Sequence, residues 1–267
     1  MSSSRYDSLR SFSYGLTFDL DDAIAFFRDN GCLLISGVLS SSDIEELKRE
    51  TYDLFNEEVS HGVAVRYAPQ VDRIWNLVNK RESYQHIVTL PLVSQLMNLV
   101  FDRPTHHQKF FLTSCQATIM RPGAVRQPLH IDAPLPDPLP QWEVKANTIW
   151  LLDDFTANNG ATEVIRRSHR FGRRPVTHEV NDHPGVEKVI APAGSLLVTS
   201  GYLWHRAGTN TTNVDRMALL AAFASSFMRE ISSEEDIVRR RMKDVNFPMS
   251  EECWRLAGGE HGIRPGI

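Results

Sequence analysis

Two side chains that can bind a metal, His130 and Asp132, lie two residues apart in the sequence. In a β-strand, residues two apart point to the same face, so this spacing predicts that both side chains project together. His205, much later in the chain, is the best candidate for a third ligand. Two imidazole nitrogens and one carboxylate oxygen leave three positions of a metal open, an arrangement typical of non-haem iron(II) oxygenases.

The motif His-x-Asp is weak evidence by itself, because most such pairs are structural. The chain has ten histidines, and those other than His130 and His205 are by default surface or hydrogen-bonded residues. The context favours the metal interpretation. The pair lies in a strand-like segment of a region rich in β-branched and aromatic residues, and His205 follows after several turns.

Arg216 opens an apolar segment that has the character of a strand. Such a strand would direct the guanidinium group into the interior, where a buried arginine needs an anion. The alternatives are a salt bridge to Asp215 and a surface position, and they would be preferred if Arg216 stood alone. With the three metal ligands present, a dicarboxylate co-substrate explains Arg216 better. Its far carboxylate would contact Arg216, and its keto-acid end would chelate the iron.

Length and composition describe an ordinary globular protein with 267 residues, a net charge of −4 and 42% hydrophobic residues. The chain has no basic stripe and no apolar run of about 20 residues, so neither nucleic acid nor a membrane is expected as a partner. The serine-rich segment 1–14 lacks the apolar core of a secretory signal. The three cysteines, Cys32, Cys115 and Cys253, form no metal or redox pattern. These features predict a reducing, cytoplasmic setting.

The pattern of apolar and turn-forming residues predicts a flexible tail at residues 1–17 and a single domain at residues 18–267. Up to about residue 108 the pattern is mostly helical, with a helix start at the capping box Ser42–Glu45 and a Pro91 that interrupts a later helix. From about residue 229 to 260 the pattern is helical again.

The middle of the chain, about residues 109–228, is rich in β-branched and aromatic residues. It breaks into short segments separated by turn signals, which indicates a barrel or sandwich. The expected strands are 110–120, 146–152, 161–165, 186–190, 195–198 and 217–223. We therefore expect an α+β fold in which helices pack against one β core.

Several short motifs follow one another in a distinctive order. They are Asn30-Gly31-Cys32, Gln127 to Asp132, Asn159-Gly160-Ala161-Thr162, Ser168-His169-Arg170, His205 to Asn210 and Asp215-Arg216. Their order resembles the phytanoyl-CoA dioxygenase family of iron(II)/2-oxoglutarate-dependent oxygenases, most closely the members that modify fungal secondary metabolites. The resemblance runs from about residue 29 to 229 and implies a double-stranded β-helix, a jelly-roll, cupin-like core with flanking helices.

The resemblance also implies which residues form the site. His130, Asp132 and His205 would bind Fe(2+), and Arg216 would hold the distal carboxylate of 2-oxoglutarate. Two further residues, Gln127 and Thr162, match positions that hydrogen-bond 2-oxoglutarate in such enzymes. The alternatives are that Gln127 is an ordinary polar loop residue and Thr162 an ordinary strand residue.

One segment departs from the family pattern. Where the family usually has Pro-Gly before Ser-His, this chain has Arg166 and Arg167 before Ser168 and His169. The replacement is expected to lose a turn and to add two charges. It leaves the metal and 2-oxoglutarate positions untouched.

The implied reaction oxidises a C–H bond of a small-molecule natural product with O2 and releases succinate and CO2. Hydroxylation is the simplest outcome, with desaturation, epoxidation and ring rearrangement as alternatives. Asp132 disfavours halogenation, because related halogenases have a small residue there. Two other functions stay open: a non-catalytic metal-binding barrel, and an oxygenase that acts on a protein side chain. Related enzymes suggest a homodimer.

Substrate contacts are the least determined part of the site. A proline-rich loop, Ala133 to Gln141, follows the ligand pair and is either a stiff lid or a plain connector. Other residues either line the pocket or pack in the interior, and they are Arg66, Tyr67, Arg73, Trp75, Asn76, Phe111, Trp150 and Trp204.

Overall fold

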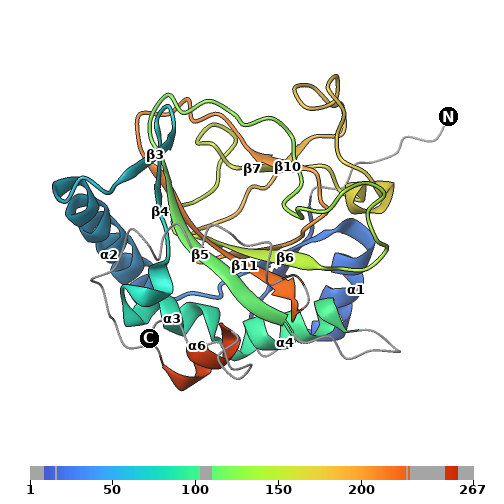
Figure 1. Cartoon of the computed structure of the whole chain (residues 1–267), viewed down its shortest axis with the longest axis horizontal. Helices are drawn as coiled ribbons and strands as arrows, with labels where there is room; N and C mark the ends of the chain where they lie inside the picture. Colours follow the sequence, from blue (N-terminus) through green and yellow to red (C-terminus); the bar gives the residue numbers. More distant parts are fainter. Residues whose placement is uncertain (1–8, 16, 103–109, 227, 229–249, 258–267) are drawn as a thin grey trace.

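A computed structural model describes residues 9–15, 17–102, 110–226, 228 and 250–257 (Figure 1). Half of the tail expected at residues 1–17, and most of the helical stretch expected at 229–260, lie outside the described residues. Within the described ranges, no helix has the length and apolar character needed to cross a membrane.

A sheet of eight strands forms the body of the molecule. From one edge to the other its strands are β1 (Ser11–Ser13), β2 (Cys32–Ser36), β9 (Leu196–Ser200), β6 (Lys145–Leu151), β11 (Arg216–Ser225), β5 (Phe110–Met120), β4 (Val71–Ile74) and β3 (Val65–Ala68). All neighbours are antiparallel except β1 and β2. Strands far apart in the sequence, such as β2 and β9, thus lie side by side.

A second, smaller sheet consists of β10 (His205–Ala207), β7 (Thr162–Val164) and β8 (Glu187–Lys188), all antiparallel. Figure 1 shows β7 and β10 on one side of the large sheet and the helices on the other. The functional cavity lies between the two sheets, because its walls come from both of them.

The helices pack on the remaining face of the large sheet (Figure 1). They are α1 (Leu20–Asn30), α2 (Ser41–Ser60), α3 (Glu82–Val88), α4 (Pro91–Phe101) and α6 (Glu251–Leu256), with the 3-10 turn η1 (Leu77–Asn79). A second 3-10 turn, η2 (Ser168–Phe171), follows β7 and contacts Trp204 beside β10. The largest apolar cluster fills the space between helices and sheet and includes Phe27 of α1, Leu47 of α2 and Trp150 of β6. The α+β fold expected from the sequence is confirmed.

Strand β11 lies between β6 and β5 and is buried along nearly all of its length. Met217, Leu219 and Phe223 belong to the apolar cluster under the helices. Arg216 and Ala218 line the cavity on the opposite face. The two-residue period of the strand therefore sends alternate side chains to the core and to the site.

The region before residue 108 is less helical than its sequence pattern predicted, since it also contributes β1, β3 and β4. Strands β3 and β4 form a hairpin whose sequence alternates apolar and charged residues, such as Arg66 and Asp72. Four-residue strands with this composition carry a weak apolar signal. Pro91 begins α4 instead of interrupting a helix, because the first turn does not use its missing N–H group.

Helix α2 begins earlier than its sequence pattern predicted. The N-cap is Ser40, whose hydroxyl oxygen accepts a hydrogen bond from the Asp43 backbone N–H at 3.2 Å. Asp43 in turn accepts one from the Ser40 backbone N–H at 3.0 Å, which completes a capping box. The expected box at Ser42–Glu45 is wrong by two residues, since a run of serines offers several equivalent starts.

The cap at Ser40 gives a simple test of this boundary. We expect Ser40→Ala to lower the free energy of unfolding by about 1 kcal/mol, because the Asp43 N–H loses its acceptor. Urea unfolding followed by circular dichroism measures the change. Ser42→Ala is the matched control and should have a smaller effect, and the opposite order would place the cap at Ser42.

Candidate metal centre

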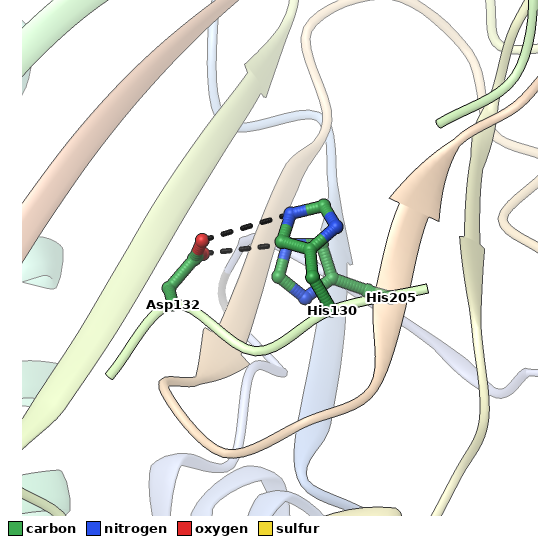
Figure 2. A group of neighbouring side chains, drawn as sticks. All are labelled: His130, Asp132 and His205. Carbon is green, nitrogen blue, oxygen red and sulfur yellow. Dashed lines mark ion pairs between the residues drawn. The ribbon is translucent and has the colours of Figure 1, made fainter. Parts of the chain in front are cut away.

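Three potential metal ligands, His130, Asp132 and His205, lie together (Figure 2), and all three line the cavity. Each offers one ligand atom, and these atoms lie within 4.8 Å of one another. The Asp132 carboxylate faces both rings, at 3.3 Å from Nε2 of His205 and 3.8 Å from Nε2 of His130. The sequence-predicted ligands thus converge in space.

The backbone holds the two histidines side by side. His130 and His205 form an isolated antiparallel bridge, in which each N–H donates to the other residue's carbonyl at 3.0 Å. The expected strand through His130 and Asp132 is not formed, because the chain bends directly after this bridge. Instead, the backbone N–H of Asp132 donates to the carbonyl of Gly201 at 3.0 Å. A single bridge and a turn therefore do the positioning that we attributed to a strand.

Hydrogen bonds to the backbone orient both imidazole rings. Nδ1 of His130 lies 2.9 Å from the carbonyl of Pro128, and Nδ1 of His205 lies 2.9 Å from the carbonyl of Leu203. A carbonyl only accepts, so each Nδ1 carries the proton and each Nε2 keeps a lone pair in the neutral ring. Both lone pairs belong to the atoms nearest Asp132, which fits a metal held by two imidazoles and one carboxylate.

Asn147 of β6 fixes the carboxylate ligand. Its side-chain N–H donates to Oδ2 of Asp132 at 2.6 Å, and Asn147 itself is buried. A hydrogen-bond partner of this kind restricts the rotation of the carboxylate and holds it in one orientation for metal binding. The sequence did not indicate Asn147, because a single amide in an apolar strand has no distinctive spacing.

Burial and charge act against each other at the three ligands. Burial alone would raise the pKa of Asp132, but the neighbouring charge and hydrogen bond of His205 lower it well below its usual range. Burial likewise opposes a charged His205, yet Asp132 raises the pKa of His205 above its ordinary value. Burial lowers the pKa of His130, with help from the charge of His205. Asp132 is therefore ionised and ready to bind a cation.

The ligands open into a cavity of about 680 Å³ between the two sheets. This volume is typical of a small-molecule site. The floor comes from the large sheet and the opposite wall from β7 and β10. All six site residues expected from the sequence line it, and they are Gln127, His130, Asp132, Thr162, His205 and Arg216.

Arg216 is only 3% exposed, and its guanidinium group lacks a carboxylate partner among the described residues. Its Nη2 donates to the carbonyl of Gly160, the group lies 4.5 Å from the ring centre of Phe155, and its Nε has no hydrogen-bond acceptor. Burial lowers the pKa of Arg216 to about 10. A buried cation with an unused donor fits an anionic ligand from the cavity.

The alternative of a salt bridge between Arg216 and Asp215 does not occur. Asp215 instead accepts hydrogen bonds from Arg121 at 2.5 Å and from the hydroxyl of Tyr52 at 3.0 Å. Its carboxylate points away from the cavity, which it does not line. Adjacent residues on a strand face opposite sides, which separates the two groups.

Gln127 and Thr162 line the cavity in different ways. Oε1 of Gln127 already accepts a hydrogen bond from the backbone N–H of Ala207 at 3.0 Å, which leaves its amide N–H groups for a ligand. Thr162 is buried in β7, opposite Ala207 of β10. Both side chains are within the cavity wall, and their contact with a co-substrate stays a prediction.

The residues expected as substrate contacts divide into two groups. Tyr67, Arg73 and Trp75 of the β3–β4 region line the cavity. The others do not: Arg66 pairs with Asp72, Asn76 hydrogen-bonds to Asn79, and Phe111, Trp150 and Trp204 are buried in the interior.

The proline-rich loop at 133–141 is a packed connector. Ala133, Leu135 and Leu139 form an apolar cluster with Tyr202 and other residues, and no residue of the loop lines the cavity. The departure at Arg166 and Arg167 also differs from expectation, since the turn is kept. Arg167 adopts a left-handed conformation with φ 68°, and the two arginines pair with Glu187 and Asp29.

The phytanoyl-CoA dioxygenase (PhyH) family model matches residues 27–218. The chain belongs to this family. It is 26% identical to dioxygenase af480 of Aspergillus fumigatus over 91% of the chain and 79% of that protein. It is also 26% identical to the multifunctional dioxygenase ausE of Aspergillus calidoustus over 80% of the chain and 75% of that protein.

Solved structures share the fold. The carbocyclase SnoK from nogalamycin biosynthesis, described as α-ketoglutarate-dependent, superposes with a TM-score of 0.64 at 16% identity and covers 86% of this chain and 94% of SnoK. HygX from Streptomyces hygroscopicus, solved with nickel, 2-oxoglutarate and hygromycin B, gives 0.62 at 16% identity, covering 77% and 87%. The jelly-roll core is confirmed, and with the family this makes the protein a non-haem iron(II)/2-oxoglutarate-dependent dioxygenase.

Asn147 provides a test of how the metal ligands are oriented. We expect Asn147→Leu to weaken metal binding by about ten- to hundredfold, because Asp132 loses the hydrogen bond that orients it. Titration calorimetry with Mn(II) measures the affinity. Thr148→Val is the matched control, since the next residue of β6 lies outside the cavity wall. Equal affinity of the leucine variant and the wild type would remove Asn147 from this role.

Glu143 lies beside the turn that holds Asp132, and it accepts a hydrogen bond from the Ser200 hydroxyl at 2.9 Å. Burial raises the pKa of Glu143 from 4.5 to about 7, although hydrogen bonds from Ser200 and Gly201 oppose the rise. The folded protein therefore binds this proton more tightly than the unfolded chain. The resulting stability is fully present below about pH 4.5 and is lost as the pH rises to about 7.

We expect Glu143→Gln to flatten the fall in stability between these two pH values, because glutamine does not ionise. The free energy of unfolding from urea titrations at several pH values measures the slope. Glu45→Gln, on the exposed face of α2, is the control and should leave the slope unchanged. A slope that is the same in the Glu143 variant and the wild type would contradict the assignment.

Proposed function

We propose that His130, Asp132 and His205 bind iron(II), and that the loaded protein oxidises a C–H bond of a small-molecule natural product with 2-oxoglutarate as co-substrate. The observation that carries this proposal is the convergence of two Nε2 atoms and one carboxylate in a cavity that also holds the buried guanidinium of Arg216. A metal site and an unpaired interior cation in one cavity match a chelating dicarboxylate.

Two arginines of the cavity match the two carboxylates of 2-oxoglutarate. Arg216 would bind the distal carboxylate through the donor that has no protein acceptor. Arg73 lines the same cavity and stacks on Tyr67, with its guanidinium carbon 3.5 Å from the ring centre. Its positive charge contributes to lowering the pKa of His130. We propose that Arg73 faces the carboxylate at the keto end, beside the metal. Gln127 and Thr162 would complete the contacts from the opposite wall.

When bound, iron(II) and 2-oxoglutarate supply the oxidising chemistry, in which O2 is consumed, succinate and CO2 are released and a substrate C–H bond is oxidised. The residues of the protein orient the metal ligands and enclose the reaction site. Asn147 holds Asp132, the backbone bridge holds the two imidazoles, and apolar residues such as Ile149 and Leu220 keep water from the cavity. Because Asp132 fills a ligand position, hydroxylation is favoured over halogenation.

The names of related proteins support a natural-product substrate. FUM3 of Gibberella moniliformis and ausE are described as dioxygenases, and the neighbouring structures SnoN and HygX contain nogalamycin RO and hygromycin B. A cytoplasmic location agrees with three cysteines that are all free and buried. That location and a homodimer stay predictions.

Two other functions compete with this proposal. A non-catalytic metal-binding barrel would have no reason to keep a buried arginine without an anion, since that arrangement costs stability. An oxygenase acting on a protein side chain would use the same centre. Succinate release measured with candidate natural products and with peptides separates the two substrate classes.

The co-substrate assignment has a direct spectroscopic test. Iron(II) and 2-oxoglutarate added without oxygen should produce a visible charge-transfer band, and its absence from the wild-type protein would contradict the site. Arg216→Ala should raise the 2-oxoglutarate concentration needed for the band by at least about tenfold, because a charge-assisted contact is lost. Arg126→Ala, at the exposed rim of the cavity, is the control and should need the wild-type concentration.

A further inference from the structure

Lys145, the first residue of β6, lines the cavity with a half-buried side chain. Its ammonium group makes no hydrogen bond or ion pair with any residue that the structure describes. A half-buried ammonium group that lines a cavity is able to pair with an anionic group of a ligand. The cavity is the place from which that anion can come.

The backbone fixes Lys145 next to the metal ligands. The carbonyl of Lys145 accepts a hydrogen bond from the Gly201 N–H at 2.7 Å, and the carbonyl of Gly201 accepts one from the Asp132 N–H at 3.0 Å. A Cβ at Gly201 would lie 2.6 Å from the Lys145 carbonyl oxygen, so only glycine allows this approach. Asn147, two residues along the same face of β6, contacts Asp132 directly.

Lys145 and Arg216 stand at opposite ends of the cavity floor. Lys145 is paired with Ala224 of β11, and Arg216 is the first residue of that strand. The nine residues from 216 to 224 span about 26 Å of extended chain. A five-carbon diacid held by Arg216 and the metal is much shorter, so Lys145 is available to a second molecule.

The described residues that line the cavity carry more positive than negative charge. Asp132 is the one carboxylate among the described lining residues, and Arg206 is neutralised by Glu163 at 2.6 Å. Bound iron(II) and the two carboxylates of 2-oxoglutarate cancel each other in charge, and the negative charge of Asp132 acts on both histidines and on Lys145. Arg216 and Lys145 together then carry more positive charge than the single carboxylate of Asp132 can balance.

We propose that the substrate carries an anionic oxygen group, in its simplest form a carboxylate, that pairs with Lys145. The apolar part of the substrate would then lie over Ala222 at the Lys145 end of the floor, while 2-oxoglutarate occupies the part toward Leu220 and Arg216. This arrangement presents a C–H bond to the metal at a fixed distance from the anionic end. The inference rests on the proposed function, since it names the substrate class of that same site.

The test compares two probes of equal length, decanoate and decanol. Each is titrated by calorimetry into oxygen-free protein loaded with iron(II) and 2-oxoglutarate, and the charge-transfer band is recorded in parallel. We expect the wild type to bind decanoate at least about tenfold more tightly than decanol, because a charge-assisted contact forms only with the carboxylate. Lys145→Met and Lys145→Gln should lose this preference and keep the wild-type requirement for 2-oxoglutarate. Lys145→Arg and Lys188→Met, the latter outside the cavity wall, should keep the preference.

Three results would overturn the inference: equal binding of the two probes or binding of neither by the wild type, an unchanged preference in both Lys145 variants, or a raised 2-oxoglutarate requirement in them. The last result would assign Lys145 to the co-substrate. If the band fails to form in the wild type, the proposed function itself is contradicted. Thermal unfolding of each variant, compared with the wild type, identifies any loss of fold.

Discussion

The reciprocal pair of backbone hydrogen bonds between His130 and His205 is the constraint on which the site depends. It brings two residues from distant parts of the chain to one point, with both rings tilted against each other at 4.5 Å between centres. Because main-chain atoms make this link, it places the two Cα atoms independently of the side chains. The carbonyls of Pro128 and Leu203 then determine which ring nitrogen is left to bind a metal.

The third ligand is held by a different device, the turn at Gly201. Gly201 accepts a hydrogen bond from the Asp132 N–H and donates one to the Lys145 carbonyl, so a single residue links the candidate metal site to the wall of the cavity. Glu143 and Ser200 brace the same turn from outside. The geometry of the candidate metal site is thus set largely by backbone contacts, and the side chains around it provide charge and shape.

Residue types and spacing were enough to predict that His130, Asp132, His205 and Arg216 share one site, and the structure brings all four to the same cavity. The positioning was beyond the sequence. A strand was expected at His130 and Asp132, yet a bridge and a bend serve instead, since the side-chain pattern does not reveal which carbonyl a backbone N–H will find. Asn147 was missed because its role depends on a partner in another segment. The β3–β4 hairpin was missed because its strands are short and charged.

The two faces of β11 are under different structural constraints. Met217 and Phe223 lie in the interior under the helices, where a change of volume disturbs tightly packed neighbours. Ala222, on the other face, borders the cavity and carries the smallest side chain that a strand residue other than glycine can have. A larger residue at this position would reshape the cavity without entering the core under the helices. The core-facing and cavity-facing side chains of one strand can therefore change independently. A family with this fold can acquire new substrates through the cavity-facing residues without rebuilding its core.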